Sequence, residues 1–386
     1  MSEYQYYEFL AMDRPLSARE MAELRALSTR ARITTVSFVN EYSWGSFKGD
    51  PDTLMERYFD AHVYLANWGQ RRFSLRLPRD VLDFKMAAAY GTEYALVIRD
   101  AGEHWVIDWN LSAEDEGGGW VSEDEGHDWM ARLTPLREEL LRGDWRGLYI
   151  GWLAGMAAGE VEDDRLEPPV PAGLKQFTAA QLALATFLAV DFDLLTGAVM
   201  ASADAATDTT PPGEMETWLD TVPPDEARDV LRQLLAGEGQ RVERSLKARF
   251  VAWQRAQRPP TTTGATRRTV AELQRLADEV EQIRQRQETE VRARADAERQ
   301  KQREAYLATL ARDFDRAWAA ADQQAVRGVA AAYDEVRRAV IDLAEAYERH
   351  ATREQFEQAL QRFMTPHVRR TALVKRLIDA GLWKRR

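Results

Sequence analysis

The sequence contains no cysteine among its 386 residues and only five histidines. Without cysteine there are no disulfides, no thiolate nucleophiles and no zinc or iron–sulfur sites built on cysteine. No apolar run reaches the roughly 18 residues that cross a bilayer, and the start MSEYQYYEF lacks the basic and apolar regions of a leader. These absences predict a soluble cytoplasmic protein that does not enter a membrane.

Familiar catalytic motifs are absent as well. The sequence has no GxGxxG, GxxxxGK[ST], HExxH, GxSxG or EF-hand pattern, so phosphate loops, zincins and α/β-hydrolase elbows have no support. We expect no cofactor, and a non-enzymatic protein is favoured over an enzyme.

The charges are unevenly distributed along the chain. The first 240 residues contain 21 basic and 42 acidic residues, whereas the rest contains 31 basic and 21 acidic ones. With 45% hydrophobic residues and 12 tryptophans the chain can bury a core, and its length predicts two or three folded units. The acidic front half disfavours nucleic acid, while the basic tail permits it.

Residues 1–160 are predicted to form an acidic, tryptophan-rich α+β domain. Capping-box spacing at Ser17 and Glu20 opens a helix. Leu54 and Leu65 belong to an apolar series with three- and four-residue spacing, which predicts a second helix reaching Trp68. Strands are predicted at 4–12, 33–42 and 73–77, with a hairpin over 94–110.

Four glycines follow at every fourth residue, namely Gly147, Gly151, Gly155 and Gly159. On a helix this strip lets another element approach closely. Since the apolar stretch 148–158 is about half of the ~20 residues of a membrane span, we expect tight packing within the chain.

The remainder is predicted to be mainly helical. Residues 172–256 form a helical segment in which the apolar stretch 178–200 breaks near Val190 and Asp191, and the PPTTTG sequence within 257–268 marks a linker. Residues 269–318 are predicted to form one long charged helix, a partial coiled coil, followed by a small basic helical module at 319–386.

The long helix has three parts. Its first turns carry a heptad-compatible apolar seam suited to a partner helix or to self-association. Its middle, 284–304, has seven basic and five acidic residues among 21 and is predicted to be a solvated rod. Partners are therefore expected at the helix ends, and the residues proposed for this contact are Val270, Leu273, Val280 and Ile283.

Exposed aromatic side chains are candidates for a second binding surface. Tryptophans near Tyr42 and Tyr64 either line a groove for a peptide or for stacked bases, or belong to the core. The candidates are Trp44, Trp68, Trp105 and Trp109.

Three further groups of residues are candidates for metal, acid/base or phosphate chemistry. His104 and Asp108 lie on one side of a predicted strand and form either a metal or acid/base pair or a cross-strand polar pair. An acidic loop gathers possible ligands for a hard cation, with a solvated loop as the alternative; these residues are Glu123, Asp124, Glu125, His127 and Asp128.

Basic residues at the C-terminus suit phosphate contact, with solvated charges as the alternative; they are Arg369, Arg370, Lys375, Arg376, Lys384, Arg385 and Arg386.

The segments SEYQYYEF, FVNEYSWGSFKGDPDTLMERYFDA and YLANWG resemble a family of bacterial proteins without an established function. The likeness is close over roughly the first 75 residues and weaker at FLAVDFDLL and ALVKRLIDAGL. The family provides no catalytic residues to carry over. Its relatives are encoded near SWIM-type zinc-finger proteins, so the resemblance implies a complex linked to DNA or to defence against phage.

Three functions follow as hypotheses. The first is a non-enzymatic adaptor or scaffold of a bacterial multiprotein complex. The second is a nucleic-acid-associated subunit, in DNA repair or phage defence, that uses the basic C-terminal module. The third is a metal-dependent enzyme that uses the acidic loop and His104.

Overall fold

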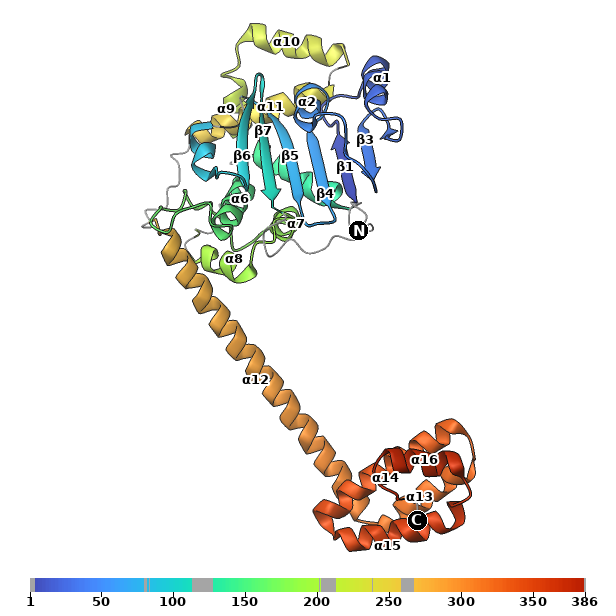
Figure 1. Ribbon diagram of the computed structural model, residues 1–386. Coiled ribbons are helices and arrows are strands. Elements are labelled where there is room, and N and C mark those ends of the chain that lie inside the picture. The colour runs from blue at the N-terminus through green and yellow to red at the C-terminus, as the bar shows by residue number, and fades with distance from the viewer. Residues whose placement is uncertain are drawn as a thin grey trace. The chain divides into compact units, whose positions relative to one another are not determined.

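The computed structural model describes residues 4–79, 82, 84–112, 128–200, 202, 213–237, 239–257 and 267–384. The chain divides into two compact units, Met1–Gln282 and Ile283–Arg386, which we call unit 1 and unit 2 (Figure 1). The boundary falls inside the segment 269–318, where the sequence predicts one long helix.

Unit 1 is built on a seven-stranded antiparallel sheet with the order β2-β3-β1-β4-β5-β7-β6. The strands are β1 (Gln5–Leu10), β2 (Arg32–Ile33), β3 (Ser37–Tyr42), β4 (Ala61–Ala66), β5 (Arg71–Pro78), β6 (Leu96–Ala101) and β7 (His104–Leu111). The α+β class expected for this region is confirmed.

Helices cover both faces of the sheet. On one face, α1 (Ala18–Leu27) and α2 (Pro51–Arg57) bury Leu24 and Leu54 against Phe9 and Phe38. The larger core lies on the other face, where Phe73 and other strand residues meet helices that follow the sheet in sequence. These are α4 (Trp129–Leu133), α5 (Pro135–Leu141), α6 (Arg146–Ala157), α7 (Ala179–Phe187) and α8 (Phe192–Val199), and the short α3 (Phe84–Ala87) and η1 (Ala88–Tyr90) precede them.

The prediction of a helix that reaches Trp68 is wrong. Asp50 caps α2 by accepting from the backbone of Asp52 and Thr53, but the helix ends at Arg57. The following residues form β4, which lies between β1 and β5 and is buried at five of its six positions. A strand covered on both faces carries apolar residues without alternation, so its sequence also fits a helical period.

The glycine strip packs tightly within the chain, as expected. Three of the four glycines lie on α6, and Gly159 follows the helix with a φ of +76°. A Cβ atom at Gly151 would lie 2.7 Å from Cδ1 of Trp109, and one at Gly155 would lie 2.5 Å from Cγ2 of Thr92. Glycine at these two positions lets α6 approach β7 and the start of β6.

Gly151→Ala is expected to lower the free energy of unfolding of unit 1 by about 1–3 kcal/mol, because the added methyl group overpacks the buried ring of Trp109. Gly147→Ala is the matched control. Its Cβ atom would meet Leu136 at an ordinary 3.6 Å, and alanine favours helix by up to about 1 kcal/mol. Urea unfolding of both variants checks this prediction, and equal midpoints would contradict it.

The apolar stretch 178–200 breaks near Asp191 as predicted, since α7 ends at Phe187 and Asp191 caps α8. Three helices complete the described part of unit 1 before the long helix, namely α9 (Glu214–Leu219), α10 (Pro224–Leu235) and α11 (Gly239–Gln257).

The long helix, α12 (Val270–Ala311), is shorter than predicted. Asp313 caps a separate helix by accepting from the backbone of Arg316, so the chain does not continue as one helix to Trp318. Every residue from 281 to 302 is exposed. The coiled-coil character of α12 stays a prediction.

Unit 2 is entirely helical in its described residues. After the last part of α12 come α13 (Phe314–Val326), α14 (Ala330–His350), α15 (Arg353–Met364), η3 (Thr365–His367) and α16 (Thr371–Asp379). The predicted capping box of Thr352 and Gln355 opens α15. The core of unit 2 contains Trp318, Val340, Phe363 and Leu377. Within the described ranges of both units, no helix is both long enough and apolar enough to cross a membrane.

Candidate functional site

Two of the four tryptophans proposed for partner binding lie exposed at the same end of the sheet. Gln5 of β1 pairs with Tyr42 of β3 on one side and with Ala66 of β4 on the other. Trp44 and Trp68 each follow two residues beyond these partners. Their side chains are 79% and 37% exposed, and with Tyr94 and Gln70 they form what we call the aromatic edge.

Trp44 is presented by a loop that is fixed on both sides. Before it, Tyr42 ends β3. After it, the carbonyl oxygen of Gly45 accepts a hydrogen bond of 3.1 Å from Nε2 of Gln5, and the ring of Phe47 packs 5.3 Å from that of Tyr7. A loop backbone that is already held in place loses little conformational freedom when it binds a partner.

Trp68 and Tyr94 are joined through Gln70. Trp68 occupies the turn between β4 and β5, where Gly69 takes a φ of +100°. Nε1 of Trp68 donates to Oε1 of Gln70, and Nε2 of Gln70 donates to the hydroxyl of Tyr94, both at 3.4 Å. Tyr94 is 39% exposed. The linkage holds two aromatic rings from different turns at one end of the sheet.

A layer of tyrosines supports this edge. Tyr7 donates a 2.7 Å hydrogen bond to Oε1 of Gln5, and Tyr64 donates to the same oxygen at 3.3 Å. Burial, followed by the neighbouring Tyr7, raises the pKa of Tyr64. Its phenol therefore keeps its proton at neutral pH and acts as a hydrogen-bond donor.

Two aspartates and two arginines, whose charges balance, form an ion-pair network beside the tyrosines. Asp108 is buried and accepts from Nε and Nη2 of Arg72, from Nε of Arg99 and from the hydroxyl of Ser74 at 2.6–3.0 Å. Asp52 of α2 contacts the same two arginines. Although burial opposes ionisation, Arg72 and Arg99 hold the pKa of Asp108 below its ordinary value. The network fastens the start of α2 to β5, β6 and β7.

His62 lies in the core beside Ser74 of this network. The strand register aligns Phe9, His62, Ser74 and Asp108 across four neighbouring strands. The imidazole stacks on Phe9 with 3.9 Å between ring centroids. Nδ1 lies 3.0 Å from the carbonyl oxygen of Glu8, which only accepts, so Nδ1 carries the proton. Nε2 is buried and has no hydrogen-bond partner among the described residues.

Stability is expected to fall below pH 6.5 because of His62. Burial, with a smaller effect of Arg72, lowers its pKa to about 3, whereas an unfolded histidine titrates near pH 6.5. Between these values the unfolded chain binds a proton that the folded chain does not, so acidification favours unfolding by up to about 1.4 kcal/mol per pH unit. Urea unfolding of unit 1 at pH 7, 6 and 5 checks this slope.

His62→Gln is expected to flatten the slope, while His350→Gln, which changes an exposed histidine of unit 2, is expected to preserve it. The same slope in wild type and His62→Gln would contradict the assignment.

The other two proposed tryptophans lie inside unit 1. Trp109 is fully buried, stacks on Phe73 and donates from Nε1 to the carbonyl oxygen of Gly147 at 3.0 Å. Trp105 is 6% exposed and stacks on Phe84 at 4.5 Å. Neither side chain is accessible to a partner at the surface of unit 1. His104 and Asp108 share a face of β7, but the hydrogen bonds of Asp108 go to the arginines and Ser74.

The acidic loop proposed to bind a metal falls mostly outside the described residues, since Glu123, Asp124, Glu125 and His127 are not among them. Asp128 is described and directly precedes α4 without capping it through its side chain. Elsewhere in the described ranges, no three or more histidine and carboxylate side chains are grouped so as to hold a metal ion.

The first turns of α12 pack on unit 1 itself. Val270 and Leu273 are fully buried in its larger core, whereas Val280 is half-buried and Ile283 is 54% exposed. The partner of the first two residues is thus the chain's own core. For Val280 and Ile283, contact with a second protein stays a prediction.

A buried ion pair fixes the start of α12. Nε and Nη2 of Arg268 donate to the carboxylate of the buried Glu167 at 2.8 and 2.9 Å. Arg268 also donates to the carbonyl oxygens of Gly197 and Ala198 at the end of α8. Thr269 then caps the helix together with Glu272.

The basic C-terminal residues differ in their surroundings. Arg376 pairs with Asp334 at 2.8 Å, and Arg370 donates to the hydroxyl of Tyr333. The exposed side chains of Arg369, Lys375 and Lys384 make no ion pair with any described residue. Arg385 and Arg386 lie outside the described residues.

Comparison with known proteins gives no further guide, because no family model, no curated protein and no solved structure matches the chain. The sequence analysis identified Trp44 and Trp68 but missed Tyr94, Gln70 and the arginine–aspartate network. Strand register brings these residues together, and no local sequence signal reveals it.

Proposed function

We propose that the protein is a cytoplasmic, non-enzymatic adaptor that binds a protein partner through the aromatic edge of unit 1. The exposure of Trp44 on a fixed loop carries the proposal. Tryptophan is enriched among the residues that dominate binding energy at protein interfaces. A ring that is mostly in water, on a backbone that is already held in place, offers the area that such a contact needs at a reduced entropy cost.

The division into two cores supports the adaptor role. Unit 1 and unit 2 have separate hydrophobic cores, and the exposed residues 281–302 contribute to neither. Each unit therefore offers its own surface to a partner. Self-association through the half-buried Val280 and the exposed Ile283 belongs to the same proposal.

Affinity capture from the source cells tests this function. Tagged wild-type protein is compared with Trp44→Ala and Trp68→Ala, and proteins that depend on both tryptophans are then purified and titrated. Loss of a central aromatic contact is expected to weaken binding by about 2 kcal/mol or more, or roughly thirtyfold. Val36→Ala is a suitable control, because Val36 is exposed and precedes β3 at the other end of the strand. Equal capture by all variants would count against the proposal.

A nucleic-acid-associated role for unit 2 is the second candidate, favoured by the exposed Arg369, Lys375 and Lys384, which form no ion pair with the part of the chain that the structure describes. If these residues bind phosphates, their replacement by glutamate should weaken DNA or RNA binding and flatten its salt dependence. Binding by wild type that does not change with salt would exclude this role.

A further inference from the structure

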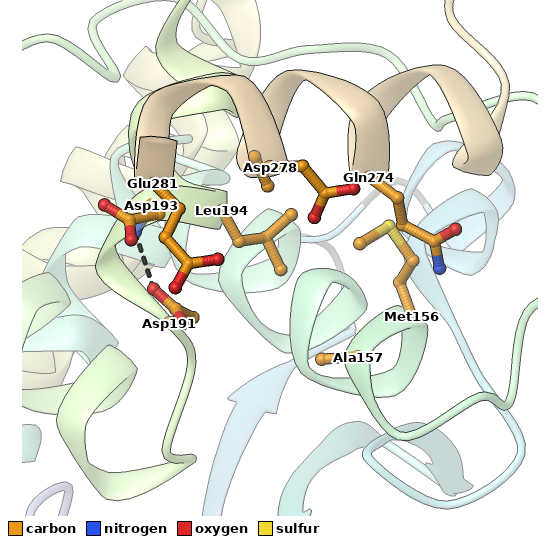
Figure 2. Close-up of a pocket in the computed structure, with 9 residues that line it drawn as sticks. Met156, Ala157, Asp191, Asp193, Leu194, Gln274, Asp278 and Glu281 are labelled. Atoms are coloured by element: carbon orange, nitrogen blue, oxygen red, sulfur yellow. Dashed lines mark hydrogen bonds between the residues drawn. The ribbon is translucent and has the colours of Figure 1, made fainter. Parts of the chain in front are cut away.

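A small cavity in unit 1 lies between α6, α8 and the first turns of α12 (Figure 2). Its volume is about 180 Å³. The apolar part of its wall comes from all three helices and consists of Met156, Ala157, Leu194 and Ala277. An unbranched, flexible methionine side chain adapts well to a ligand of irregular shape.

Carboxylates surround this apolar wall. Asp191 and Asp193 come from the start of α8, and Asp278 and Glu281 come from α12. Figure 2 shows the carboxylate of Glu281 directed toward Asp191, and that of Asp278 directed toward Gln274. One oxygen of Asp191 accepts from the backbone of Asp193 at 2.7 Å. This excess of carboxylates gives the cavity a negative potential that attracts cations.

The carboxylates are not arranged for a metal ion. Within the described ranges, no three carboxylate or histidine side chains come close enough together to hold one. The cavity instead pairs an apolar wall with separated negative charges. That combination suits an organic cation, whose apolar part contacts the wall while its charge reaches the carboxylates.

We propose that this cavity binds an arginine side chain presented by a protein partner. The three methylene groups of arginine would lie along Met156 and Leu194. Its guanidinium group has five donors in a planar fork, so it can pair with carboxylates from α8 and α12 at the same time, which a lysine ammonium does less well. The excess of acidic residues in the first 240 residues further favours a cationic partner.

The probe for this site is N-acetyl-L-arginine amide, with the neutral N-acetyl-L-citrulline amide as its isostere. Full-length protein is labelled with ¹³C in its methionine methyl groups, and the Met156 signal is followed during titration. The other nine methionines serve as internal references. The Met156 signal is expected to shift saturably with the arginine amide and to stay in place with the citrulline amide.

A second experiment removes negative charge from the cavity. Asp278→Asn combined with Glu281→Gln changes two exposed positions of α12 and is expected to weaken arginine binding at least tenfold. Glu279→Gln combined with Glu290→Gln removes the same charge from the same helix outside the cavity and is expected to preserve binding. No saturable shift in wild type, an equal shift with citrulline, or equal weakening in both double variants would overturn the proposal.

Discussion

Asp108→Ala is expected to lower the free energy of unfolding of unit 1 by about 3–5 kcal/mol, the usual effect of breaking a buried ion pair from one side. Asp108 is 3% exposed and accepts from Arg72, Arg99 and Ser74. Its removal leaves two neighbouring guanidinium groups with only the partly exposed Asp52 between them. Like charges then repel one another beside a core that water scarcely reaches.

Urea unfolding at neutral pH measures this effect, with Asp52→Asn as the control. The side chain of Asp52 is 40% exposed, so its loss should cost no more than about 1 kcal/mol. If both variants unfold at the same urea concentration, the burial of Asp108 does not make it the dominant member of the network.

Arg268→Ala is expected to release the first turns of α12 from unit 1 and to destabilise that unit by about 3–5 kcal/mol. The variant leaves the carboxylate of Glu167, which is 1% exposed, without its cation. Two carbonyl oxygens at the end of α8 also lose a donor. Val270 and Leu273 come shortly after Arg268 in the sequence. Their burial in the core of unit 1 therefore depends on this ion pair.

Hydrogen exchange of the amides of Val270 and Ala271 measures whether the first turns of α12 stay packed on unit 1, because these amides donate to the carbonyl oxygens of Arg165 and Asp163. Arg267→Ala is the matched control. Arg267 is exposed and donates to the backbone of Glu167 and not to its carboxylate. Exchange should accelerate strongly in Arg268→Ala and little in Arg267→Ala, and the reverse order would refute the anchoring role.

Local signals in the sequence predicted local structure well. The capping boxes at Ser17 and Thr352 both open helices, and Asp191 separates α7 from α8. In each case the deciding hydrogen bonds join residues at most three positions apart. Such bonds depend little on the rest of the fold.

One failure came from non-local packing. The spacing of Leu54, Tyr58, Ala61 and Leu65 fits a helix, yet burial by helices on both sheet faces turns Ala61–Ala66 into a strand. The prediction of an overlong α12 has a different cause, because Asp313 caps the next helix through Arg316, only three residues on, and the apolar periodicity was followed across this local signal.

The tryptophans illustrate the same limit within the candidate site. Composition marks Trp44 and Trp109 as equivalent, but Trp44 lies in a loop beyond the strands and Trp109 points from β7 toward α6. The antiparallel order of β3, β1 and β4 then places Trp44 and Trp68 at one end of the sheet. Pairing between distant strands is not encoded in local residue spacing.

Site-specific photo-crosslinking in the source cells tests the adaptor proposal most directly. A benzophenone amino acid replaces Trp44 in one variant, Trp68 in a second and Val36 in a control. The proposal predicts that the same protein is crosslinked from positions 44 and 68 and not from position 36. Crosslinks from position 36 to the same protein with equal yield, or no crosslinked protein from either tryptophan position, would contradict a partner-binding surface at the aromatic edge.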